Sequence, residues 1–201
     1  MNIEDVNENP EMPENIWKAI FDKQEELMVK YKKIEGLPDW PIELDLCGHQ
    51  IVIKDFKQRG MEEVAEAIEA FRQNETMHFA EELIDALHFF TELNKLVGKD
   101  ADYFELDNIF KIEPEGLSLE SLYTMNGMLS EKYGLLCNTL KNKPWKQSHI
   151  STDKIKFYEL LKDSFEYFIY MLKESGFSKE EIYNVYFKKN KVNNFRIRSK
   201  Y

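Results

Sequence analysis

The most constraining feature of this sequence is a pair of helix-like segments, residues 61–71 and 78–98, separated by a polar stretch. Apolar side chains recur in both segments at the spacing of one helix face. The stretch between them contains Gln73-Asn74-Glu75-Thr76, which suits a chain reversal. A reversal here would lay the two helices antiparallel. We therefore predict an all-α fold, an antiparallel helical bundle built around this pair.

Each of the two segments carries a pair of carboxylates three residues apart, Glu63 with Glu66 and Glu82 with Asp85. Residues at this spacing lie on one face of a helix, so the two pairs are predicted to face each other. Four carboxylates at close quarters repel strongly unless cations neutralise them. Oxygen ligands without softer neighbours favour Mg²⁺, with open positions left for substrate phosphates.

An alternative for the acidic pairs is structural ion pairing to lysines. A single E-x-x-E pattern is common on exposed helices and has little weight by itself. Glu82 and Asp85, however, lie among Leu83, Ile84 and Leu87, close to a face expected to be buried. Because an unpaired buried carboxylate is costly, a counter-cation is the natural remedy.

Composition excludes some classes of function. The 201 residues carry a net charge of −10, which argues against nonspecific binding to nucleic acid. Cys47 and Cys137 are far apart and fit no metal-binding spacing, so we expect free thiols in a reducing cytoplasm. We find no apolar run of membrane-spanning length and expect no membrane association.

The rest of the chain is predicted as one all-α catalytic domain, residues 15–201, after a flexible lead-in of residues 1–14. Between residues 36 and 60, punctuated by prolines and glycines, His49–Lys54 is predicted as a short strand or an extended arm. After a connector at 99–116, further helices are predicted at 118–142 and 152–175, and from Ser178, whose spacing to Glu181 fits a capping box.

Candidate substrate contacts come from both ends of the chain. Lys189, Asn190, Asn193 and Arg196 would share one face of a continuing helix. Lys and Arg suit phosphate, and Asn suits a sugar hydroxyl or a base edge, although a basic run of this kind is also typical of a solvated helix end. Gln24 lies within an apolar helical stripe. It is either a solvated residue at the flank of that stripe or a residue that hydrogen-bonds a ligand.

His88 follows Asp85 at helical spacing and is a further candidate for substrate binding. An Asp-x-x-His pattern also occurs in di-iron carboxylate bundles, but these use two Glu-x-x-His copies, and this chain offers one histidine there. A histidine that supports the site from behind, or that is satisfied within the core, is the other interpretation.

These residues together resemble a known superfamily. E63-V-A-E66 and E82-L-I-D85 followed by A-L-H88-F are similar to the core of the all-α nucleoside triphosphate pyrophosphatases, which include the MazG-type enzymes and the dimeric dUTPases. The segment from Tyr186 to Arg196, with the terminal Tyr201, resembles the C-terminal motif of the dimeric dUTPases and of related phage dCTP/dUTP pyrophosphatases. D22-K-Q24-E-E-L27 resembles their first motif, in which the Gln lies near the base.

The chain departs from this pattern at a few places. Ile197 and Lys200 stand where the family commonly has Gln and Gly, and an Asn often found near Gln24 is missing. Residues from 99 to about 160 match no part of the pattern and are predicted as a helical insertion. The departures bear on the choice of base more than on the chemistry.

The resemblance implies Mg²⁺-dependent hydrolysis of a deoxynucleoside triphosphate, first dUTP, to the monophosphate and pyrophosphate by a homodimer. Glu63, Glu66, Glu82 and Asp85 would hold about two or three Mg²⁺ ions, with Glu66 as the general base. By the same resemblance, the phosphates would contact Lys189 and Arg196, the sugar or phosphate would contact Asn190 and Asn193, and the pyrimidine would contact Gln24.

Three alternatives stay open. In the first, the enzyme hydrolyses dCTP or several dNTPs. In the second, the chain is a non-catalytic helical protein that binds nucleotides or another partner. In the third, it is a di-metal redox protein, which the single histidine disfavours.

Overall fold

The structure is a computed structural model that describes residues 1–199, and this range contains helices and no β-strand. The predicted all-α class is therefore confirmed. The α-helices are α1 (Ile16–Glu35), α2 (Cys47–Arg72), α3 (Thr76–Leu96), α4 (Leu106–Ile109), α5 (Leu119–Thr139), α6 (Lys154–Glu174) and α7 (Lys179–Ser199). Two short 3₁₀ helices, η1 (Ile3–Asp5) and η2 (Ala101–Tyr103), precede α1 and follow α3.

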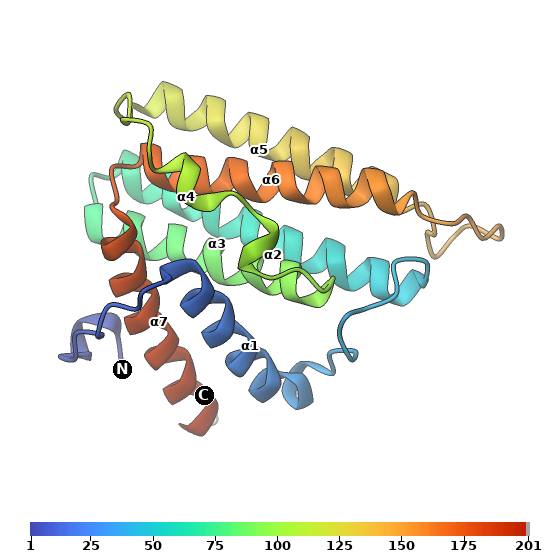
Figure 1. The fold of residues 1–201 in the computed structure, drawn as a ribbon, viewed down its shortest axis with the longest axis horizontal. Coiled ribbons are helices and arrows are strands. Elements are labelled where there is room, and N and C mark those ends of the chain that lie inside the picture. The colour runs from blue at the N-terminus through green and yellow to red at the C-terminus, as the bar shows by residue number, and fades with distance from the viewer. Residues whose placement is uncertain (200–201) are drawn as a thin grey trace.

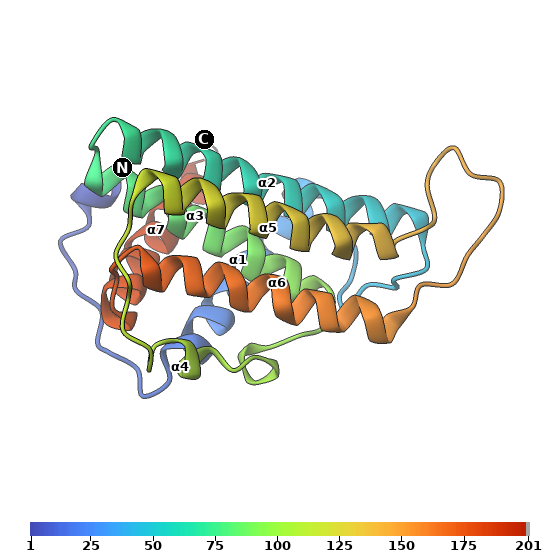
Figure 2. The ribbon, with the colours of Figure 1, turned by 90° about the horizontal axis from the view of Figure 1, so that it is seen from above.

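The long helices are arranged around the α2–α3 hairpin. Helix α3 turns back along α2, and α6 turns back along α5 on one side of this hairpin (Figures 1 and 2). Helices α1 and α7 lie side by side and pack against α3 on its other side (Figure 1). The face of α3 that meets α1 and α7 is where segments from both halves of the chain come together.

Local sequence signals explain most helix boundaries. The Asn15 side chain accepts a hydrogen bond of 2.9 Å from the Lys18 amide at the start of α1. The Ser118 side chain caps α5 in the same way. Ser178 and Glu181 exchange hydrogen bonds at the start of α7, as the predicted capping box requires. Asn74, with φ of +60°, turns the chain between α2 and α3.

The prediction of a strand or extended arm at His49–Lys54 is wrong, because α2 already begins at Cys47. Along this part of α2 the buried residues Ile53, Phe56 and Gly60 recur at helical spacing. Gly60, one of the glycines that punctuate residues 36–60 in the sequence, lies inside the helix. A Cβ placed there would lie 2.4 Å from Cε1 of Phe90, so the glycine permits α2 and α3 to approach closely.

Helix α5, inside the segment predicted as an insertion, contributes to the main hydrophobic core. Tyr133 of α5 is fully buried and stacks on Phe90 of α3, with ring centroids 4.6 Å apart. At the N-terminal end, Ile3 and Val6 are buried, and η1 contacts α7. Both segments are thus packed onto the helices that carry the predicted site.

Two smaller observations concern the composition. Cys47 and Cys137 do not form a disulfide. Within residues 1–199, every helix is too short or too polar to cross a membrane.

Candidate functional site

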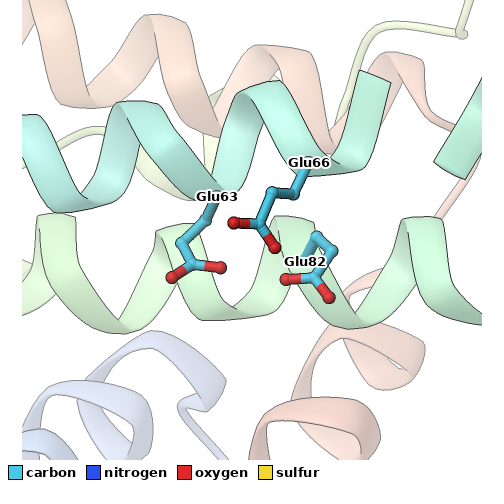
Figure 3. A group of neighbouring side chains, drawn as sticks. All are labelled: Glu63, Glu66 and Glu82. Atoms are coloured by element: carbon cyan, nitrogen blue, oxygen red, sulfur yellow. The ribbon is translucent and has the colours of Figure 1, made fainter. Parts of the chain in front are cut away.

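Three glutamates converge between the two helices of the α2–α3 hairpin. Glu63 and Glu66 project from α2, and Glu82 projects toward them from α3 (Figure 3). One carboxylate oxygen from each of the three lies within 4.8 Å of the others. The facing acidic pairs expected from the sequence therefore meet in space at three of their four positions, in a group that could hold a metal ion.

The electrostatics of this acidic cluster (Glu63, Glu66 and Glu82) are unfavourable without a cation. Burial raises the pKa of Glu63 to about 8, and a hydrogen bond with Glu82 and the negative charges of Asp85, Glu82 and Glu66 raise it further in the same direction. Glu63 thus holds its proton well above the usual range of a carboxyl group. A bound cation would remove this penalty.

Asp85, the fourth predicted metal ligand, lies beside the cluster and pairs with a lysine. Its Oδ2 is 2.6 Å from Nζ of Lys189, which also lies 3.6 Å from Glu81. Burial raises the pKa of Asp85 to about 6, although the positive charge of Lys189 opposes the shift. Structural pairing to a lysine, weighed as an alternative for all four acids, is therefore present at Asp85.

Glu82 also has a partner that the sequence interpretation did not assign. Nε2 of His78, one turn earlier on α3, lies 2.6 Å from Oε1 of Glu82, and its Nδ1 lies 3.0 Å from Glu75. The hydrogen bond with Glu75 raises the pKa of the exposed His78, and the charge of Glu82 adds to the effect. The i, i+4 spacing of His78 and Glu82 was the available signal for this pair.

A cavity of about 240 Å³ begins at the acidic residues and is enclosed by α1, α2, α3 and α7. Six of the residues predicted from the sequence lie on its wall: Gln24, Glu63, Asp85, His88, Asn193 and Arg196. Glu66, Glu82, Lys189 and Asn190 are not among the residues that line it. The cavity therefore brings together side chains from residue 24 to residue 196.

Gln24 lies at the centre of a buried hydrogen-bond network in this wall. Its Oε1 accepts hydrogen bonds from the Tyr186 hydroxyl, at 2.8 Å, and from Nδ1 of His88, at 2.6 Å. Its Nε2 donates to Oε2 of Glu92 at 3.1 Å. The His88 ring stacks on Tyr186 with centroids 4.1 Å apart. Gln24 is thus a buried residue, not a solvated flank residue.

His88 is neutral in this network. Burial lowers its pKa to about 3, and the charge of Lys189 lowers it further. Because the oxygen of a carboxamide can only accept, Nδ1 of His88 must carry the ring proton that it shares with Gln24. Nε2 is then an acceptor, and it is buried without a hydrogen-bond partner.

Sequence reasoning missed Glu92, one turn beyond His88 on α3. The residue is buried and lies on the cavity wall, and burial raises its pKa to about 8. Its Oε1 is buried and has no hydrogen-bond partner. The signal in the sequence is a glutamate placed among the apolar residues of segment 78–98, one face of which is expected to be buried.

Arg59 is a further charged residue on the cavity wall to which the sequence analysis assigned no role. It lies one turn before Glu63 on α2. Its guanidinium pairs with Glu35 at 2.7 Å and with Asp55 at 2.9 Å and lies over the ring of Phe56. In the sequence, Arg59 is one of three positive charges, with Lys54 and Lys57, that precede the first acidic pair.

The residues predicted on α7 divide between two surfaces. Asn193 and Arg196 line the cavity, and Lys189 reaches Asp85. Asn190 instead lines a separate groove together with Lys23 and Phe187. The predicted positions at Lys200 and Tyr201 lie outside the described residues.

A larger cavity of about 510 Å³ lies between the start of α1 and residues 100–108. It contains none of the residues predicted to carry chemistry, so its size does not make it the better candidate. We place the site at the cavity of about 240 Å³, because there the acidic residues and the buried polar network share one wall.

Comparison with known proteins adds one finding. The model of a family described as dUTPase matches residues 63–201, which is more than half of the chain. The match includes both acidic pairs and α7. The search of curated proteins and the search of solved structures gave no match.

Proposed function

This chain belongs to the dUTPase family, and on that basis we propose that it hydrolyses dUTP to dUMP and pyrophosphate. A single observation in the structure supports this most directly. The wall of one cavity carries both the carboxylates of Glu63 and Asp85 and the buried polar groups of Gln24, His88 and Glu92. A nucleoside triphosphate needs these two environments, oxygen ligands for a cation–phosphate complex and a polar recess for a base.

We propose Mg²⁺ as the metal, held by Glu63, Glu66 and Glu82, with Asp85 joining when its contact with Lys189 is exchanged for the cation. The donor set consists of carboxylate oxygens alone, which suits a hard cation such as Mg²⁺. The raised pKa of Glu63 fits this assignment, because it records negative charge that has no counter-ion. When bound, Mg²⁺ would neutralise phosphate charge and lower the pKa of a coordinated water.

The residues of the chain would divide the remaining tasks. Glu66 is the most exposed member of the cluster, and its carboxylate would accept the proton of the attacking water. Glu82, held by His78, would keep its carboxylate oriented toward α2. Lys189, already beside Asp85, and Arg196, on the cavity wall, would counter the charge of the phosphate oxygens.

The decisive experiment is an assay of dUTP, dCTP and the other dNTPs with Mg²⁺, in which pyrophosphate release is measured. We expect release from dUTP, and loss of activity when the metal is chelated. A purified, folded chain that releases no pyrophosphate from any dNTP would contradict the proposal and favour a non-catalytic nucleotide-binding protein.

The metal assignment is tested by Glu82→Gln, which removes a ligand charge and keeps the side-chain shape. We expect kcat to fall at least about 100-fold, or about 2.7 kcal/mol, with helicity unchanged by circular dichroism. Glu62→Gln, at an exposed position of α2, is the matched control. Retained activity in the Glu82 variant would remove this residue from the metal site.

We also propose that the chain forms a homodimer in the cytoplasm, as the resemblance to dimeric dUTPases implies. Sedimentation of the purified protein should give a mass of twice the 24.0 kDa of one chain. A monomer that is active at assay concentrations would contradict this part of the proposal.

A further inference from the structure

Glu92 is placed to contact the base of a bound nucleotide. It lies on the wall of the cavity and is buried on α3. One carboxyl oxygen, Oε2, accepts from Gln24, whereas the other, Oε1, is buried with no partner at all. Buried polar atoms are almost always hydrogen-bonded, so this oxygen at the cavity wall is available to a polar group of a ligand.

A second unsatisfied atom belongs to the same network. Nε2 of His88 is an acceptor without a partner, and His88 also lies on the cavity wall. The polar atoms of Gln24, by contrast, are engaged with His88, Tyr186 and Glu92. The groups that remain for a ligand are therefore Glu92 and the outer nitrogen of His88, not Gln24.

We propose that Glu92 contacts the substituent at C4 of the pyrimidine ring and sets the choice between uracil and cytosine. This inference rests on the proposed function, since it assigns the base subsite of the same cavity. Gln24, the residue predicted to read the base, instead holds Glu92 and His88 in position from behind.

The two protonation states of a carboxyl group suit different base edges. Beside the substituent at C4, a neutral carboxyl donates one hydrogen bond, which O4 of uracil can accept and the amino group of cytosine cannot. At this position a carboxylate can only accept, so it repels O4 of uracil but accepts from the exocyclic amino group of cytosine. A neutral Glu92 thus admits uracil, and an ionised Glu92 favours cytosine.

The groups around Glu92 come from each helix of the cavity. Glu35 and Tyr31 belong to α1, Arg59 to α2, and Tyr186 and Arg196 to α7. Burial raises the pKa of Glu92 to about 8, and the charge of Glu35 adds to this, while Arg59 and the hydrogen bond from Gln24 oppose it. The carboxyl is therefore mostly neutral at neutral pH and ionises in mildly alkaline solution.

The first test is the ratio of kcat/KM for dUTP to that for dCTP, measured at about pH 6.5 and about pH 9. For the native chain we expect the ratio to fall by about tenfold or more as pH rises. In Glu92→Gln the amide donates at every pH, so the ratio should change only as far as ionisation of the bases themselves changes it. Ionisation of the free bases affects both proteins equally and cancels in this comparison. Glu26→Gln, an exposed change on α1, should follow the native chain.

The second test measures base binding without phosphate, metal or catalysis. Binding of deoxyuridine and deoxycytidine is followed by NMR in the presence of chelator, with thermal melting as the check of folding. At about pH 6.5 we expect the native chain to bind deoxyuridine more tightly than deoxycytidine, and a folded Glu92→Ala variant to lose this preference.

The outcomes separate this inference from the proposed function. Nucleoside discrimination that depends on Glu92 supports the inference even if no dNTP is hydrolysed. Hydrolysis of dUTP with a substrate ratio that is the same in the native chain and in Glu92→Gln at both pH values would overturn it. Nucleoside binding unaffected by Glu92→Ala would overturn it as well.

Discussion

Glu63 and Glu92 share an unusual property, a carboxyl whose pKa in the folded chain is about 8. Glu63 is crowded by Glu66, Glu82 and Asp85, and Glu92 is buried on the cavity wall. In the unfolded chain the pKa of both would lie near 4.5, the usual value for a glutamate. Between these two values the folded chain binds more protons than the unfolded chain does.

This difference predicts how stability depends on pH. Because the folded state holds the extra protons, the free energy of unfolding falls as pH rises from about 4.5 to about 8. Without metal, thermal melting should show a lower Tm at pH 8 than at pH 5.5, by about 2–4 °C for each kcal/mol lost. Mg²⁺ should recover part of this loss at the higher pH. A Tm that rises steadily over this range would contradict the assigned shifts.

A second prediction at this scale concerns Arg196, which lies on the cavity wall. Loss of a charge-assisted hydrogen bond to phosphate costs about 1.5–3 kcal/mol. Arg196→Ala should therefore lower kcat/KM for dUTP by about 10–100-fold. Arg198→Ala is the control, because Arg198 lines the separate groove on α7. Equal kinetics in the two variants would exclude Arg196 from the site.

At the scale of the helix, the close approach of α2 and α3 depends on Gly60. Phe90 lies where a Cβ would be, and it is held between Tyr133 and Phe168. Gly60→Ala should therefore destabilise the chain by about 1–3 kcal/mol, measured by urea unfolding. Gly127→Ala, at an open position within α5, should instead stabilise it by about 0.4–1 kcal/mol. A stabilised Gly60 variant would show that the two helices can separate without cost.

Helix formation depends largely on local sequence, and there the predictions succeeded. The apolar periodicity of residues 61–71 and 78–98 and the capping residues Asn15 and Ser118 act over a few positions. The prediction of a strand or extended arm before residue 60 was wrong because a glycine such as Gly60 usually interrupts a helix. Its role in the helix is clear only once its contact with Phe90 is known. Close packing between helices is not recorded in local sequence.

The candidate site was predictable in part, for a related reason. Helical spacing predicts its acidic residues, and three of them, Glu63, Glu66 and Glu82, lie close together in the structure. Helical spacing does not predict the role of Glu92, because its burial depends on α1 and α7, which lie at opposite ends of the sequence. Asn190 was misleading because it comes one residue after Lys189 and so points about 100° away from it, into a different groove from the cavity that Asn193 lines.

For the whole molecule, the segment between residues 99 and 160 is part of the structure that supports the site. Tyr133 is fully buried against Phe90, on the helix that carries Glu82 and His88. Tyr133→Ala should lower the free energy of unfolding by about 3–5 kcal/mol, measured by urea unfolding. Trp145→Ala, at a side chain that is 77% exposed, should change it by less than about 0.5 kcal/mol. Similar values for the two variants would mean that α5 is dispensable.

The placement of α7 has a consequence for how the protein is made. A ribosome synthesises α1, with Gln24, early and α7, with Lys189, Asn193 and Arg196, after the other helices. Folding during translation proceeds from the N-terminal side, so the recess stays open on one side until α7 has left the exit tunnel. A nascent chain arrested after α6, or the product of a premature stop codon there, would present the acidic carboxylates without their cationic partner helix and should not retain a nucleotide.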